Sequence, residues 1–341
     1  MKRVFSYLLA FGLIGFSANA AQTTPSQSLT GQINIDGSAT VFPISEGVGE
    51  DFQKTQKNLR VKVASSGTGG GFQKFCRGEA DITGASRPIE AVELELCAKN
   101  KTSFVELPIA YDGIAIVVNP NNTTAKTMTT AQLKKLWEPG SKVKTWGELG
   151  GAFAADANLK DKEIKIYGPG PEHGTFDYFT KVINGKEKAI RSDFTASNPD
   201  VIVSAIAGNK LSLGYFGYAY YFANKSKLGL VGVDAGKGAV LPDAQTIASG
   251  KYAPLSRPIF IYVSEKALAR PEVAAFIDYY IQNVSKIAPE VGYVSLGADM
   301  YKLVAQRFEN KVTGTLYDKS KTISDVSLKT LLSQSNTKKL K

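Results

Sequence analysis

The chain has 341 residues, of which 43% are hydrophobic and 21% are charged, and its formal net charge at pH 7 is +10. This composition is typical of a globular protein, so it excludes an intrinsically disordered chain and allows one large or two ordinary domains. Lys and Arg are spread among acidic residues, apart from a basic cluster at residues 338–341. We therefore expect no nucleic-acid partner, whereas a positive surface would raise the local concentration of a small anion.

The first twenty residues have the pattern of a secretory signal peptide. Lys2 and Arg3 precede an apolar stretch at residues 4–16, and Ala18-Asn19-Ala20 is a cleavage site of the A-x-A type. No other stretch has the length of apolar sequence that a membrane helix needs. We predict cleavage after Ala20 and an extracytoplasmic protein, which is periplasmic in a bacterium with two membranes.

The chain contains two cysteines, Cys76 and Cys97. An even pair in an exported protein predicts one disulfide. The C-x-x-C spacing of redox-active pairs is absent, so we interpret the bond as structural. It would tie the helix that contains Cys76 to the segment at residues 90–98.

A glycine-rich turn separates a predicted strand from a predicted helix. Residues 59–64 alternate as a strand does, and Phe72 and Phe75 begin a helical apolar face. The turn between them directs backbone N–H groups and hydroxyls to one point at the positive end of a helix, which is an arrangement that binds anions. The candidate residues in this turn are Ser66, Thr68 and Gly69.

The same order of strand, small polar turn and helix occurs twice more. Residues 32–36 lead into a turn that contains Ser38 and Thr40, either of which could instead simply cap the following helix. Residues 163–167 lead into a stiff turn, and a helix with an apolar stripe follows. The third turn places a helix N-terminus at Gly174 beside the hydroxyl of Thr175, which again suits an anion.

Ser86 and Arg87 lie just after a short apolar strand and just before a stretch compatible with a helix. The guanidinium of Arg87 is a planar fork of donors that fits a tetrahedral oxyanion, so we interpret it as a source of both charge and geometry. The alternative is a surface arginine paired with Glu90 or Glu93.

Several classes of site are not expected. His173 is the single histidine, and no G-x-S-x-G elbow occurs, so neither a zinc site nor a Ser-His-Asp triad is predicted. Phe72 stands at the third glycine position of a dinucleotide pattern that begins at Gly67, and no P-loop occurs. His173 is either a hydrogen-bonding partner of the ligand, a helix-terminus residue or a structural residue. We expect a binding protein with no metal and no cofactor, not an enzyme.

Two strongly apolar segments, residues 104–119 and residues 258–263, predict central strands that are buried on both faces. Their separation suggests that the chain leaves one lobe and later returns to it. We place lobe 1 at residues 31–113 plus 256–325 and lobe 2 at residues 114–255. Residues 326–341 are assigned to a polar, basic tail.

Four motifs, in this order, resemble those of the phosphate-binding proteins of bacterial high-affinity phosphate ABC transporters. They are DGSATVFP at residues 36–43, SGTGGGF at residues 66–72, DITGASRP at residues 81–88 and HGTFDYF at residues 173–179. The resemblance extends from about residue 31 to about residue 310. It implies an α/β, two-lobed periplasmic-binding-protein fold of type II (venus flytrap), with mixed sheets flanked by helices and phosphate in the cleft. It also implies a monomeric carrier that delivers phosphate to an ABC permease.

Carried over by position, the resemblance implies one set of ligand-binding residues. These are Thr40 with Val41, Thr68, Ser86 with Arg87, and Gly174 with Thr175. The chain departs from the family pattern at two places, since many relatives have Ser where His173 stands, and the best-known branch has Asp where Arg87 stands. That branch also has an Arg in the second-lobe turn, which residues 169–171 lack. We therefore expect Arg87 to take over the charge role.

Selectivity depends on the proton that hydrogen phosphate carries and sulfate lacks. A buried carboxylate would accept this proton and would repel sulfate. Glu172 is our candidate acceptor, with Asp36 and Asp81 as weaker ones, and the alternative for Glu172 is an exposed turn residue. Other functions that share parts of this pattern are a binder of sulfate or arsenate, an exported phosphatase and a surface adhesion module.

Overall fold

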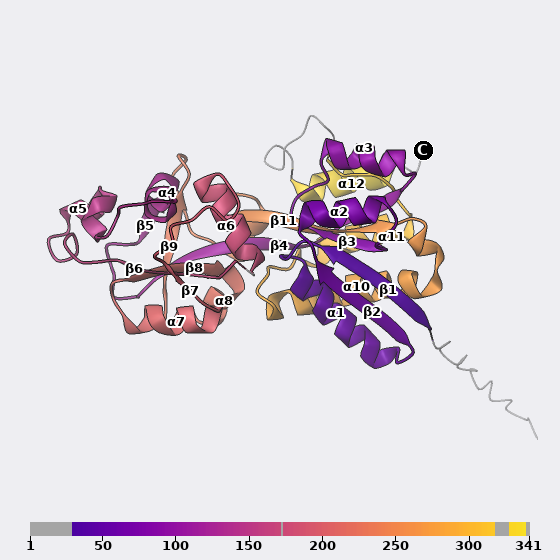
Figure 1. Cartoon of the computed structure of the whole chain (residues 1–341), viewed down its shortest axis with the longest axis horizontal. Coiled ribbons are helices and arrows are strands. Elements are labelled where there is room, and N and C mark those ends of the chain that lie inside the picture. Colours follow the sequence, from indigo (N-terminus) through magenta and orange to yellow (C-terminus); the bar gives the residue numbers. More distant parts are fainter. Residues whose placement is uncertain (1–28, 172, 318–326, 339–341) are drawn as a thin grey trace, which may run out of the picture.

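The computed structural model describes residues 29–171, 173–317 and 327–338. The predicted signal peptide and Glu172 lie outside these residues. The described chain forms two α/β lobes, which Figure 1 shows side by side along the long axis with strands β4 and β11 between them. No helix within the described ranges is long and apolar enough to cross a membrane.

The sheet of the first lobe has the strand order β2-β1-β3-β11-β4. Strand β1 pairs in parallel with β2 and β3, whereas β11 is antiparallel to β3 and β4. The strands are β1 (Gly31–Gly37), β2 (Leu59–Ser65), β3 (Ile82–Ala85), β4 (Phe104–Val118) and β11 (Ser256–Ser264). Strands β1, β2 and β3 run in the same direction, so the turns that follow them, which the sequence predicts to bind an anion, lie at the same edge of the sheet.

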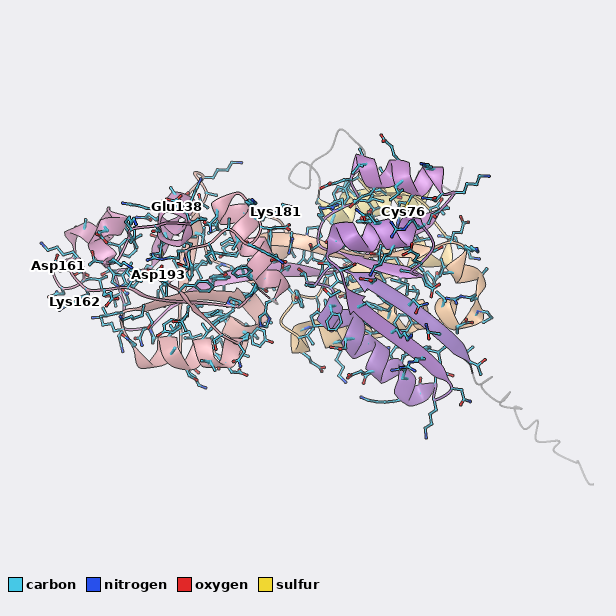
Figure 2. All side chains as sticks on the ribbon, viewed as in Figure 1. Cys76, Glu138, Asp161, Lys162, Lys181 and Asp193 are labelled. Carbon is cyan, nitrogen blue, oxygen red and sulfur yellow. A yellow bond between two sulfur atoms is a disulfide. The ribbon has the colours of Figure 1, made fainter. Side chains whose placement is uncertain are left out.

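Helices cover both faces of this sheet. Helices α1 and α10 pack together on one face, and α2 and α3 lie on the other (Figure 1). The helices are α1 (Phe42–Thr55), α2 (Thr68–Cys76), α3 (Ala91–Lys99), α10 (Pro271–Glu290), α11 (Ala298–Glu309) and α12 (Leu328–Lys338), with a short 3-10 turn at Ala267–Ala269. As predicted, a disulfide joins Cys76 at the end of α2 to Cys97 in α3. Figure 2 shows Cys76 in this lobe and Lys181 near the junction with the other lobe.

The second lobe is built on the far half of β4. Strand β4 pairs there with β8 and β9, and β8 continues to β6 and β7. The strands are β5 (Thr127–Thr129), β6 (Lys165–Gly168), β7 (Thr195–Ala196), β8 (Ser212–Gly217), β9 (Gly229–Asp234) and β10 (Ala239–Val240). The helices are α4 (Thr130–Trp137), α5 (Ala152–Ala155), α6 (Gly174–Asn184), α7 (Pro199–Gly208), α8 (Tyr218–Ala223) and α9 (Ala244–Ala248), with a 3-10 turn at Trp146–Leu149.

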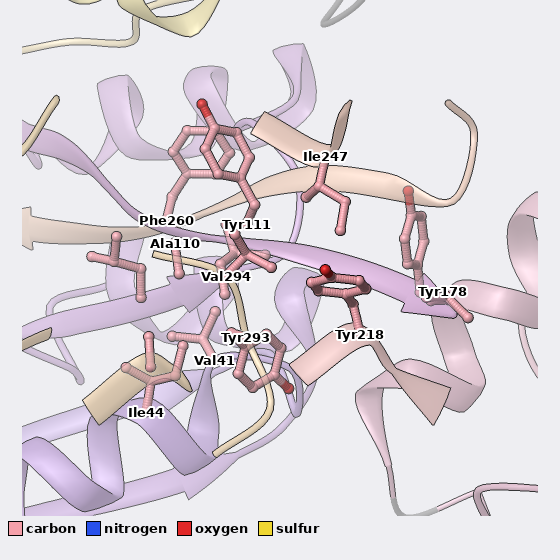
Figure 3. Packing of buried hydrophobic residues seen from close by; sticks show 14 of the residues in the cluster. Val41, Ile44, Ala110, Tyr111, Tyr178, Tyr218, Ile247, Phe260, Tyr293 and Val294 are labelled. Atoms are coloured by element: carbon pink, nitrogen blue, oxygen red, sulfur yellow. The ribbon is translucent and has the colours of Figure 1, made fainter. Parts of the chain in front are cut away.

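Strand β4 is continuous through both lobes. All fifteen of its residues are buried, which agrees with the apolar run in its sequence. Residues 104–113 pair with β11 and residues 114–118 pair with β8. The buried side chains where the lobes meet include Val41, Tyr111, Tyr178, Phe260 and Tyr293 (Figure 3). The two crossing strands, β4 and β11, therefore connect the two lobes.

The segment at residues 326–341 differs from the expected polar tail. Residues 328–338 form α12, which packs on α11. Leu328, Leu331 and Leu332 are buried, and Arg307 in α11 donates to the hydroxyl of Ser335. Three leucines at helical spacing bury one face of the helix although the segment is polar on average.

Candidate functional site

A cleft of about 690 Å³ lies between the lobes. It brings together residues from five parts of the sequence: the turn before α1, the start of α2, the end of β3, helix α6 and the start of β11. The residues predicted from sequence that line it are Ser38, Thr40, Ser66, Thr68, Gly69, Ser86, Arg87 and Gly174. The parallel strands carry the first three turns to one edge of the sheet, which explains why these turns meet.

The start of α2 forms one wall of the cleft. Gly67 precedes the helix with φ +80°, a backbone conformation that favours glycine, and no side chain caps the helix. The hydroxyls of Thr68 and Ser86 lie 3.1 Å apart, and Thr68 Oγ1 also accepts from the Ser86 N–H at 3.3 Å. The helix therefore presents its positive end beside two hydroxyls at the cleft surface.

Ser66 has a supporting contact within this wall. Its hydroxyl donates to Asp36 Oδ1 at 2.7 Å, and Lys74 forms an ion pair with the same carboxylate. Burial acts to raise the pKa of Asp36, but the hydrogen bonds from Lys74 and Ser66 outweigh it and hold the pKa below the usual value. The Ser66 hydroxyl proton is thus already donated, and Asp36 is engaged by a cation.

The turn before α1 places Thr40 in the cleft and Val41 behind it. Ser38 Oγ accepts from the Thr40 N–H at 3.2 Å. Val41 is buried, and its side chain fills the space beside Gly84. A Cβ atom on Gly84 would lie 2.8 Å from the Cβ of Val41. Its side chain is part of the core below the turn.

The start of α6 approaches the turn before α1 very closely. A Cβ on Gly174 would lie 2.3 Å from Thr40 Oγ1, so only glycine fits between the two lobes at this point. His173 and Thr175 line a second hollow of about 320 Å³ that also borders Gly174. The structure therefore places the first-lobe hydroxyls in one hollow and His173 with Thr175 in the other.

Arg87 lines the cleft, and its charge is compensated by two acids. Its Nη1 and Nη2 donate to the two oxygens of Glu93, each at 2.8 Å, and its Nε lies 3.1 Å from Glu90. Nη1 also donates to the carbonyl of Pro88. This is the pairing that the sequence analysis gave as the alternative to an anion contact.

Arg257 also lines the cleft, although it was not predicted from the sequence. It lies at the start of β11, where the lobes meet, and its Nε and Nη2 contact Asp112 Oδ2 of β4 at 3.3 and 3.2 Å. Nη2 also donates to Thr40 Oγ1 at 3.2 Å, and the guanidinium lies 3.6 Å from the centre of the Tyr178 ring in α6. One arginine therefore contacts both crossing strands and both lobes.

The acids at the cleft differ in their partners. Asp177 lines the cleft, and one of its carboxylate oxygens is buried without a hydrogen-bond partner in the described part of the chain. Burial raises the pKa of Asp177, and Lys188 and Arg257 lower it only in part. Asp81, a weaker candidate from the sequence, is engaged by Arg270 at 2.7 Å.

Comparisons with known proteins agree on one family. The model of the PBP superfamily domain matches residues 22–284. Protein SphX of Synechococcus elongatus is 42% identical over 312 residues, covering 89% of this chain and 90% of the relative. Phosphate-binding protein PstS of Staphylococcus haemolyticus is 37% identical over 280 residues, covering 81% and 84%.

A crystal structure of a possible phosphate binding protein from Planctomyces limnophilus is 44% identical and superposes with a TM-score of 0.77, covering 83% of this chain and 99% of that one. This chain belongs to the phosphate-binding protein family of the PBP superfamily. The family and the two-lobed α/β fold that the motifs predicted are thereby confirmed.

One signal in the sequence of this chain could have identified Arg257. Asp112 and Arg257 are charged residues inside or beside long apolar segments. A buried charge needs a partner, so a charge in or beside a predicted buried strand indicates an ion pair, although the sequence does not say with which residue. No group of three or more His, Cys, Asp or Glu side chains among the residues that the structure describes could hold a metal.

Proposed function

We propose that this chain is an extracytoplasmic solute-binding protein that captures inorganic phosphate in the cleft and delivers it to an ABC permease for import. The observation that carries the proposal is the convergence of Thr40, Thr68 and Ser86 with the start of α2 on one cleft between two lobes. Hydroxyls and a helix N-terminus are donors that suit a small oxyanion. The names of the PstS relative and of the Planctomyces structure as phosphate-binding proteins support phosphate as the anion.

The proposed mechanism is binding without chemistry. The lobes close on the anion by bending at the crossing strands, a motion known from periplasmic binding proteins. The closed form is the shape that a permease recognises. Thr68 and Ser86 hydrogen-bond to each other, so one of the two hydroxyls keeps its proton for the anion. Residues 1–20 would direct export, and the protein would act as a monomer.

The deciding experiment is calorimetric titration of residues 21–341, stripped of bound ligand, with phosphate, sulfate and arsenate under identical conditions. We expect one phosphate per chain and a much weaker response to sulfate. Binding of sulfate or arsenate without binding of phosphate would mean that a different oxyanion is the ligand of this protein. Turnover of p-nitrophenyl phosphate would contradict the non-catalytic mechanism and favour a phosphatase.

A further inference from the structure

Arg257 faces the cleft and contacts both lobes. Its side chain is 13% exposed and lines the cleft. It donates to Thr40 Oγ1 of the first lobe at 3.2 Å and lies against the ring of Tyr178 in the second lobe. Because β11 is one of the two crossing strands, this contact is set by the backbone that connects the lobes.

Asp112 holds the guanidinium in this position. The two residues are direct register partners on β4 and β11, and the Asp112 side chain is fully buried. Asp112 contacts Nε and Nη2, whereas Nη1 donates no hydrogen bond to any residue that the structure describes. The carboxylate therefore fixes one edge of the fork and leaves donor capacity on the other.

Arg87 is in the opposite situation. All three of its nitrogens contact carboxylates, with Glu93 bidentate and Glu90 on Nε. Two carboxylates against one guanidinium leave the local charge negative. A further anion would have to displace one of these pairs, so Arg87 is poorly suited to supply charge to the ligand.

We propose that Arg257, not Arg87, is the arginine that binds the anion in this cleft. The guanidinium would bind the anion next to Thr40. It is carried by β11, one of the two strands at which the lobes bend. Arg87 would instead orient Ser86 and the start of α3 through Glu93. This inference rests on the proposed function, because it assigns the charge that holds the phosphate.

The test compares three variants by calorimetric titration with phosphate. Arg257→Lys keeps a cation next to Asp112 but removes the planar fork, and we expect affinity to fall at least tenfold. Arg257→Gln combined with Asp112→Asn removes both charges, so no buried carboxylate is left alone, and we expect a fall of at least a hundredfold. Arg87→Gln is the comparison variant from the same cleft, and we expect it to lose less affinity than either Arg257 variant. Arg77→Gln, which removes an exposed arginine that does not line the cleft, is the control and should bind phosphate like the unmodified protein.

Thermal unfolding without ligand checks that each variant is folded. The assignment is overturned if Arg257→Lys binds phosphate as the unmodified protein does, or if Arg87→Gln loses more affinity than the Arg257 variants. Should the double variant fail to fold, the comparison of Arg257→Lys with Arg87→Gln still decides. If the unmodified protein binds no phosphate, the proposed function fails; if it binds and only the order of the variants is reversed, this assignment alone fails.

Discussion

Three carboxylates line the cleft: Glu90, Asp177 and Glu187. Glu90 pairs with Arg87 and Glu187 pairs with Lys181, whereas Asp177 forms no ion pair with any of the described residues. Its raised pKa reflects burial that disfavours the charged form. A carboxylate here would accept a hydrogen bond from the P–OH group of hydrogen phosphate and would repel sulfate, which has no such proton.

We therefore predict that Asp177→Asn narrows the preference for phosphate over sulfate by at least tenfold, about 1.4 kcal/mol. Competition titrations of the two anions at constant ionic strength measure this ratio. An unchanged ratio of phosphate to sulfate affinity in Asp177→Asn would mean that another residue sets the selectivity. Asp161→Asn, on the outer part of the second lobe, is the control and should leave this ratio unchanged (Figure 2).

Asp36 stabilises the glycine-rich turn through Lys74 and Ser66, and its folded pKa lies below the ordinary value of 3.8. A lowered pKa contributes stability that is present above 3.8 and is lost as the pH falls through the folded value. Because Lys74 is partly exposed, the contribution is about 1 kcal/mol.

We predict that Asp36→Asn lowers the free energy of unfolding at pH 7 and that this difference shrinks as the pH falls below 4. Urea unfolding between pH 7 and pH 3 measures it. Glu79→Gln, which removes an exposed ion pair with Arg77, should leave stability almost unchanged. If Asp36→Asn lowered the free energy of unfolding by the same amount at every pH, the loss of stability would not come from the ionised Asp36 side chain.

The sequence predicts those elements whose pattern lies within one short stretch of the chain. The turn at residues 65–71 lies between a strand and a helix that are adjacent in the chain, so its position at a helix N-terminus follows from periodicity and glycine content. The ion pair of Arg257 with Asp112 joins residues 145 positions apart, and no local pattern indicates that β4 and β11 are neighbours in this register. Helix α12 escaped detection because its polar composition hides three buried leucines.

Helix α6 meets the first lobe at Gly174, where a Cβ would be 2.3 Å from Thr40 Oγ1 and 2.5 Å from its backbone nitrogen. Bending at the crossing strands can relieve this clash, but the lobes would then stay apart. We predict that Gly174→Ala weakens phosphate binding at least a hundredfold while the melting temperature of the ligand-free protein changes little.

The matched control is Gly208→Ala in α7 of the same lobe, because a Cβ there meets no atom within 4 Å. It should bind phosphate normally. Normal binding by Gly174→Ala would mean that the ligand-bound form does not need this close approach.

Helices α2 and α3 are tied by the disulfide between Cys76 and Cys97, which are 21 positions apart. Closing a loop of this length stabilises a fold by about 3 kcal/mol. We predict that replacing both cysteines by Ala lowers the free energy of unfolding by about this amount, measured by urea denaturation. Phosphate affinity should be nearly unchanged, since the bond lies at the end of α2 that is remote from the cleft; a large loss of affinity would instead show that it positions Thr68.

The whole molecule is connected through β4, whose fifteen residues are buried in both lobes. Unfolding of either lobe would expose its part of this strand, so the lobes should unfold together. A ligand that binds only the folded protein adds about 2.7 kcal/mol to the free energy of unfolding at one hundred times its dissociation constant.

We therefore predict a single unfolding transition in calorimetry that moves as a whole to higher temperature when phosphate is added. Sulfate at the same concentration is the control for general salt effects and should shift it much less. Two transitions, of which phosphate moves one, would mean that the lobes unfold separately and that the anion is held by a single lobe. Because the cleft is built from turns of one lobe and the start of α6 in the other, phosphate should stabilise both lobes and raise the temperature of a single transition.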